Sequence, residues 1–170
     1  MPYTDLLRLA VFTTAAEASA LAAITAITIG RDNDADTLLL AIVWWLVAAA
    51  IGLLLSRPGR AVEGVRDALA EAPTATSLPS QSPGRIAAGR LWPIGLSTVV
   101  FGALGIFFPN VAAVGAGYAL LVALSWHTRE AAVLGIEQRD GVKFYVVPTF
   151  ALRQVKLVRT PGLRSDRLGG

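Results

Sequence analysis

The stretch TLLLAIVWWLVAAAIGLLL, Thr37–Leu55, contains no charged residue. A helix rises about 1.5 Å per residue, so this stretch alone would extend roughly 28 Å, close to the roughly 30 Å of a bilayer core. Hydrophobic residues make up 54% of the chain and charged residues only 16%, which is more apolar than an average soluble domain. The sequence therefore predicts an integral membrane protein.

Three further apolar blocks resemble this one, at about 6–29, 91–108 and 111–126. Only Pro109 and Asn110 separate the last two blocks, which predicts a tight turn. We therefore expect an all-α integral membrane protein, a four-transmembrane-helix bundle made of two helical hairpins. The first hairpin would occupy residues 1–56 and the second residues 91–127.

The first block also permits a secretory leader. Its Ala18–Ala20 tripeptide, ASA, resembles the small-residue site at which such leaders are cleaved. Arg8 and Glu17 within the block, and apolar residues continuing to Ile29, favour a retained span instead. A cleaved leader is the alternative, and it would leave the orientation of the other three spans unchanged.

Basic residues predict the orientation. The chain has thirteen arginines and two lysines, most of them in the segment 57–90 and after Trp126, whereas the loop 30–36 is acidic. Loops rich in Lys and Arg stay on the cytoplasmic side. We expect a multi-pass protein of the cell membrane with both termini in the cytoplasm. The arginines are spread over separate segments, which gives no indication of a nucleic-acid-binding face.

The segment 57–90 predicts a cytoplasmic linker with an amphipathic helix. Val62, Val65 and Leu69 recur at helical spacing among charges, after Pro58, which suits the first turn of a helix. Further along, Ser82 and Pro83 resemble the start of the third long helix.

The segment 128–160 predicts a small cytoplasmic β-hairpin or three-stranded sheet. Two β-rich runs flank the Asp140–Gly141 dipeptide, which suits a two-residue hairpin turn. In that register Ile136 faces Tyr145 and Glu137 faces Phe144. A third run, Gln154–Thr160, could add a strand, and residues 161–170 are expected to be disordered. So small a sheet must dock on the bundle, on a second copy or on a partner.

Glu17 is the first candidate for function, because an ionisable residue within a span is expensive and is often part of an ion or proton site. Burial would favour the neutral acid, and Thr13 lies one helical turn away, within reach of a hydrogen bond. The alternative is a protonated side chain that hydrogen-bonds a neighbouring helix and serves packing alone.

The remaining candidates are contact residues. Four arginines could attract anionic lipid headgroups, and two aromatic residues of the tail could contact a partner: Arg57, Arg60, Arg85, Arg90, Phe144 and Tyr145. Small residues recur in the first block at Ala15, Ser19, Ala22 and Ala26, and in the fourth from Ala112 to Ala119. Such faces serve packing within the bundle or homo-oligomerisation. Trp44 and Trp45, in the middle of a span, favour packing over a ligand cavity.

The composition offers few residues from which a catalytic site could be formed. The chain has no cysteine and a single histidine, His127, so disulfides, thiol nucleophiles and His-rich metal sites are excluded, and no cofactor is expected. We expect a non-enzymatic structural, assembly or partner-binding subunit. The alternative is a small proton- or cation-coupled transporter or channel that uses the intramembrane Glu17. Four spans with one acid in the first are similar in outline to small multidrug-resistance exporters, from which the segment 57–90 and the tail depart.

Overall fold

The computed structural model describes residues 1–32, 34–74, 82–149 and 155–161. Within these residues the chain forms five helices and one antiparallel sheet of two strands. The elements in order are α1 (Tyr3–Asp32), α2 (Ala35–Leu55), α3 (Pro58–Ala70), α4 (Pro83–Phe107), α5 (Pro109–Asp140), β1 (Val142–Val147) and β2 (Lys156–Pro161). The predicted mostly helical fold with a small sheet is confirmed.

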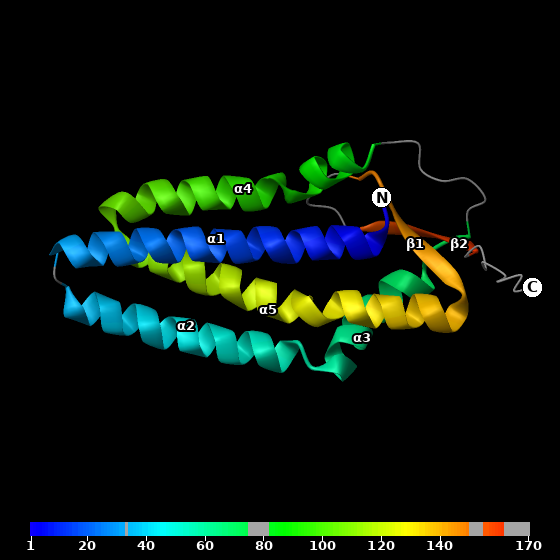
Figure 1. Cartoon of the computed structure of the whole chain (residues 1–170), viewed down its shortest axis with the longest axis horizontal. Helices are drawn as coiled ribbons and strands as arrows, with labels where there is room; N and C mark the ends of the chain where they lie inside the picture. Colours follow the sequence, from blue (N-terminus) through cyan, green and yellow to red (C-terminus); the bar gives the residue numbers. More distant parts are fainter. Residues whose placement is uncertain (33, 75–81, 150–154, 162–170) are drawn as a thin grey trace, which may run out of the picture.

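Four of the helices, α1, α2, α4 and α5, are long and apolar enough to cross a membrane. They coincide with the four predicted blocks, and each extends beyond the predicted bounds at one end or both. α1 and α5 pack side by side, with α2 against α5 and α4 against both central helices. Figure 1 shows α2 and α4 on opposite sides of the central pair.

At the far end of the bundle, α2 and α5 begin in different ways after short connections. Asp34 caps α2: it accepts hydrogen bonds from the Thr37 hydroxyl (2.5 Å) and backbone N–H (3.1 Å), and these bonds lower the pKa of its carboxyl. Between α4 and α5 the chain reverses at Phe108, so Pro109 begins α5 instead of forming the turn. Proline suits that first helical position because its missing N–H would have no partner there.

The prediction of a strand before Asp140 is wrong. α5 continues as one helix to Asp140, and Gly141 ends it in the left-handed conformation, with φ of 64°. Val133 and Ile136, one turn apart, pack into an apolar core, and this burial favours helix over strand. The predicted pairing of Ile136 with Tyr145 and of Glu137 with Phe144 is therefore absent. Instead, the Glu137 carboxylate accepts a hydrogen bond from the Phe144 backbone N–H at 2.9 Å.

The observed hairpin joins β1 to the predicted third run, which forms β2. The strands are antiparallel, with Tyr145 opposite Val158. Both outer edges of the pair are covered by chain from elsewhere. The Val146 N–H donates to the Met1 carbonyl and the Arg159 N–H to the Pro73 carbonyl, each at 3.0 Å. The predicted disordered end, 161–170, lies outside the described residues except for Pro161.

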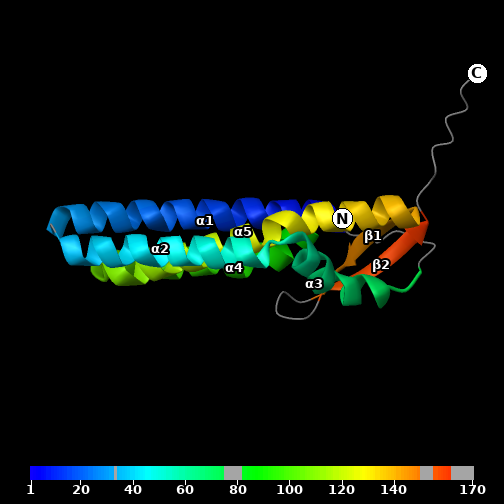
Figure 2. The same ribbon diagram turned by 90° about the horizontal axis from the view of Figure 1, so that it is seen from below.

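The sheet docks on the bundle, which is one of the three sites predicted for it. We call the assembly of the sheet, α3 and the adjoining ends of α1, α4 and α5 the head. Figures 1 and 2 show it at one end of the long helices, with the first residues of the chain inside it. Its apolar core consists of Tyr3, Leu6, Leu7, Val65, Leu69, Ala72, Ile86, Val133, Phe144, Val146 and Leu157. Of the three apolar residues predicted for the amphipathic helix, Val65 and Leu69 are buried and Val62 is 39% exposed.

The long helices pack through small residues and expose large apolar ones. α2 buries only Ala41, Ala48 and Gly52 among its residues, while most of its leucines, isoleucines and valines are exposed. On α5 the predicted small-residue face is buried. On α1 the predicted small-residue face is not buried, because Ala15, Ser19 and Ala26 are exposed. The buried face of α1 instead contains Glu17 and three threonines. The prediction of a packing face there is therefore not met within this chain.

Candidate functional site

Glu17 lies in the interior between α1 and α4, with 8% of its surface exposed. The Ser97 hydroxyl of α4 lies 2.7 Å from Glu17 Oε1 and 2.8 Å from the Ile94 carbonyl oxygen. Four residues before Ser97, Pro93 interrupts the backbone hydrogen bonds of α4. The carboxyl and the hydroxyl thus join two helices at a point where α4 has lost a backbone hydrogen bond.

The Ser97 hydroxyl has one proton and two acceptors within hydrogen-bond distance. A neutral Glu17 resolves this conflict: its carboxylic O–H donates to the Ser97 oxygen, and the Ser97 hydroxyl donates to the Ile94 carbonyl. An ionised Glu17 would instead accept the hydrogen bond of the Ser97 hydroxyl in place of the Ile94 carbonyl. The contact between Glu17 and Ser97 can therefore form with either orientation of the Ser97 hydroxyl.

Thr13, the predicted partner of Glu17, directs its hydroxyl to its own helix. Its Oγ1 lies 3.0 Å from both the Leu9 and the Ala10 carbonyl oxygens. Sequence analysis missed Ser97, which is separated from Glu17 by eighty residues. Its only signal was a hydroxyl within a span near a proline, because the pairing of α1 with α4 depends on tertiary packing.

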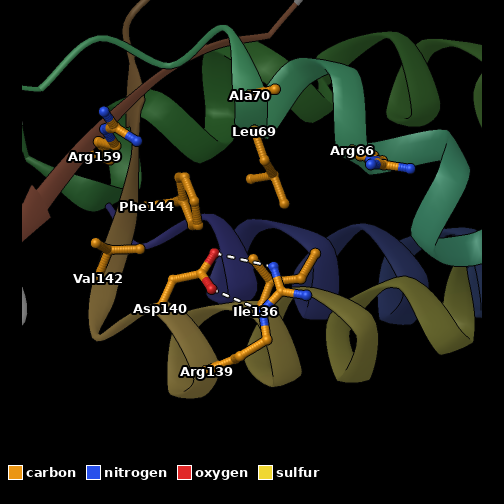
Figure 3. A pocket seen from close by; sticks show the side chains of 9 residues that line it. All are labelled: Arg66, Leu69, Ala70, Ile136, Arg139, Asp140, Val142, Phe144 and Arg159. Atoms are coloured by element: carbon orange, nitrogen blue, oxygen red, sulfur yellow. Dashed lines mark hydrogen bonds and ion pairs between the residues drawn. The ribbon is translucent and has the colours of Figure 1, made fainter.

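A second candidate site is a hollow of about 360 Å³ in the head, shown in Figure 3. Residues from α3, the end of α5, β1 and β2 line it. Its floor is apolar, with Leu69, Ile136 and Phe144 meeting at its centre. Arg66 lies at one end of this floor and Arg159 at the other, with Arg139 and Asp140 on the α5 side.

The charges around the hollow are unbalanced. Three arginines meet one carboxylate, and Arg139 already pairs with that carboxylate, Asp140, at 2.7 Å. Arg159 donates from Nε to the Thr74 hydroxyl at 3.0 Å, which orients its guanidinium without neutralising it. Among the described residues, neither Arg66 nor Arg159 forms an ion pair. The hollow therefore suits a negatively charged ligand with an apolar part.

The contact residues predicted from the sequence lie in or beside the head. Arg57, Arg60 and Arg85 are exposed, and Arg90 donates a hydrogen bond to the Thr149 hydroxyl. Phe144 is buried and lines the floor of the hollow. Tyr145 points to the opposite face of β1, as alternate residues of a strand do, and its backbone bridges to Pro2.

Sequence analysis missed the three arginines of the hollow. Arg66 is on the predicted amphipathic helix, Arg139 precedes the Asp140–Gly141 dipeptide, and Arg159 is in the third β-rich run. Each was visible as a basic residue of a segment predicted to be cytoplasmic. Their convergence on one apolar floor follows from the docking of β2 beside α3, which no local pattern indicates.

A polar belt joins the long helices where they enter the head. Arg8 forms an ion pair with Glu130 at 2.5 Å, and the Thr128 hydroxyl donates to the Ser56 carbonyl at 2.7 Å. On α5 the guanidinium carbon of Arg129 lies 5.4 Å from the centre of the Trp126 ring. Farther along the bundle, the indole N–H groups of Trp44 and Trp45 donate to carbonyls of α5, at 3.2 and 2.9 Å.

No protein family, curated protein or solved structure matches this chain. The described residues also contain no group of His, Cys, Asp and Glu that could hold a metal ion. Function must therefore be inferred from the interior carboxyl and from the hollow.

Proposed function

We propose that the chain is a four-span protein of the cell membrane and that α1, α2, α4 and α5 are its spans. Support comes from their exposed leucine, isoleucine, valine and phenylalanine side chains, which water would not favour. Charged residues bound the apolar length of α1: from Arg8 to Arg31 a helix rises roughly 35 Å, enough to cross a core of roughly 30 Å with some tilt. The polar belt would then lie at the inner surface, and membrane lipid would cover the bundle.

The orientation we propose places the head in the cytoplasm. The basic segments 57–90 and 128–170 contribute α3 and the sheet to the head, whereas the acidic connection between α1 and α2 lies at the opposite end. Cytoplasmic retention of basic loops supports this orientation. Met1 is hydrogen-bonded to β1. The start of α1 and the sheet would therefore lie on the same side of the membrane.

The function we propose is that of a non-enzymatic, partner-binding membrane subunit, with the head as the binding part. The observation that carries it is the hollow, where two arginines without an ion pair among the described residues lie at the ends of an apolar floor. From Trp126, in the polar belt, to Arg139, α5 rises roughly 20 Å. Headgroup layers add only roughly 5 to 8 Å to each side of a bilayer core, so the hollow would face soluble partners.

Single-cysteine labelling tests the membrane topology, since the chain has no cysteine of its own. Asp36, in the first turn of α2, and Glu71, directly after α3, are both exposed. Figure 1 shows the start of α2 and the end of α3 at opposite ends of the molecule. A membrane-impermeant maleimide should label Asp36→Cys in intact cells and Glu71→Cys only after lysis. Labelling of Glu71→Cys in intact cells would contradict the orientation, and extraction of the protein by alkaline carbonate would contradict the membrane assignment.

Photocrosslinking in living cells tests the binding part. A benzoylphenylalanine at Ala70, which lines the hollow, should give a discrete crosslinked product. The same probe at Ala68, which is exposed on the same helix and does not line the hollow, is the matched control. The product should disappear when Arg66 and Arg159 are both replaced by alanine. Equal products at Ala70 and Ala68, or none at Ala70, would contradict a partner at this site.

A second function is a small proton- or cation-coupled transporter, favoured by the contact between Glu17 and Ser97 inside the bundle. From Arg8 to Glu17, α1 rises roughly 14 Å, which would place the carboxyl near the middle of a bilayer. In liposomes, a proton-coupled flux should be abolished by Glu17→Gln with the fold intact. Absence of such a flux from the unaltered chain, or its survival in Glu17→Gln, would contradict transport. A second copy could contribute to such a pathway as a homo-oligomer.

A further inference from the structure

We infer that the ligand of the hollow is an acidic protein segment in which an apolar residue lies between two carboxylates. This inference rests on the proposed partner-binding function and names the chemistry of the partner. It follows from the positions of the charges, from the covered edges of the sheet and from the distance between the hollow and the bilayer.

The positions of the charges favour a ligand with two separated negative groups. Figure 3 shows Arg66 and Arg159 at opposite ends of the floor formed by Leu69, Ile136 and Phe144. Because apolar side chains lie between the two guanidinium groups, a ligand with a carboxylate at each end uses both of them and also covers the floor. An extended peptide points residues 1, 3 and 5 to one face, so acid, apolar and acid side chains in that order match arginine, floor and arginine. The hollow therefore fits a ligand with three points of contact.

The covered sheet edges decide how such a segment can bind. The outer edge of β1 is hydrogen-bonded to Met1, and the outer edge of β2 to Pro73. A peptide therefore cannot extend the sheet at these positions by backbone pairing, the mode used by many small β-domains. At these positions recognition must come from side chains, which favours specificity through the two arginines and the floor.

The ligand would belong to a protein and not to a lipid. Arg139, at the rim of the hollow, is roughly 20 Å along α5 from Trp126, beyond the reach of phospholipid headgroups. Arg139 is itself neutralised by Asp140, which leaves Arg66 and Arg159 as the two groups that discriminate. Both are exposed, so binding should weaken steeply as salt is added.

The test is peptide binding to the full chain in nanodiscs of phosphatidylcholine, followed by fluorescence anisotropy. The probe is a labelled, capped peptide, Glu-Ser-Phe-Ser-Glu. Two matched peptides replace either both glutamates by glutamine or the phenylalanine by alanine. We expect each to bind at least about tenfold more weakly, because each removes one part of the recognition.

Protein variants complete the test. Replacing Arg66 and Arg159 by alanine should weaken binding of the first peptide by at least about tenfold. Ala70→Phe should weaken it similarly by filling the hollow while leaving both charges. Arg85→Ala removes an exposed arginine of the head that does not line the hollow, and it should change nothing.

Four outcomes would overturn the inference: no binding of the first peptide, equal binding of the glutamine peptide, equal binding of the alanine peptide, or full binding by the double arginine variant. The crosslinking at Ala70 separates this failure from failure of the proposed function. If the crosslink to a partner persists while the peptide does not bind, the hollow binds a ligand of other chemistry. If both fail, the partner-binding function fails as well.

Discussion

Replacing Gly52 by leucine should separate α2 from α5. A Cβ atom at Gly52 would lie 2.8 Å from Leu124 Cβ and 3.0 Å from the Leu121 carbonyl oxygen. The carbonyl is part of the α5 backbone and the Cβ is fixed to it, so neither atom can move aside by a change of rotamer. The helices must therefore move apart, and the indole hydrogen bonds of Trp44 and Trp45 to α5 would be lost with them.

Gly95→Leu is the matched control. Gly95 is in α4 and is exposed, and a Cβ atom added to it would meet no other atom within 4 Å. Both substitutions gain the same helix propensity, so their difference reports packing alone. Overpacking costs about 1 to 3 kcal/mol, and each interhelical hydrogen bond in a membrane contributes about 0.6 kcal/mol. We expect Gly52→Leu to be less stable than Gly95→Leu by about 2 to 4 kcal/mol.

The assay is the free energy of unfolding of each purified variant in mixed micelles, titrated with dodecyl sulfate and followed by circular dichroism. Tryptophan fluorescence gives a second, local measurement, since Trp44 and Trp45 should change environment in Gly52→Leu and not in Gly95→Leu. If the two variants differ by less than about 0.5 kcal/mol, the close contact between α2 and α5 is refuted, because a real clash of backbone atoms exceeds that cost.

The remaining predictions concern the interior carboxyl, the head and the cap of α2. Ser97→Ala should lower the free energy of unfolding by about 1 kcal/mol and shift the infrared carboxyl band of Glu17, and Ser97→Thr should restore both; an unmoved band would contradict the hydrogen bond. Leu7→Ala, in the head core, should cost about 2 to 5 kcal/mol in thermal unfolding, whereas Leu9→Ala, an exposed neighbour, should cost far less. The cap at Asp34 has a lowered pKa, so its stabilisation is complete above the ordinary value near about 3.9 and is lost as the pH falls through the lower folded value. Hydrogen exchange at the first turn of α2 should therefore quicken at low pH in the unaltered chain and be fast at every pH in Asp34→Ala.

The head also bears on the leader alternative raised by the sequence. Tyr3, Leu6 and Leu7 are buried in its core, and Met1 is hydrogen-bonded to β1. Cleavage after Ala20 would remove all of these contacts together with Glu17. We therefore expect a protein cleaved there to lose its head as a folded unit.

The sequence by itself determined where the helices lie. Apolar length marked four long helices, and proline placed the starts of α3 and α4, because these signals act within a few residues of the chain. The third β-rich run was also recognised, as was the need of a small sheet for a docking surface. The predicted strand before Asp140 failed because Asp-Gly suits both a hairpin turn and the end of a helix. Burial of Val133 against distant residues decided between them.

Only the tertiary structure decided what the polar residues contact. The Ser97 hydroxyl reaches Glu17 because α4 packs on α1, and Arg66, Arg139 and Arg159 meet because β2 lies beside α3. On α1, the same helix offered a face of small residues and a face of threonines with a carboxyl, and packing buried the second. Local patterns record the preference of a segment for helix, strand or membrane. They do not indicate which distant segment will pack against each face of a helix or strand. The candidate sites depend on that packing.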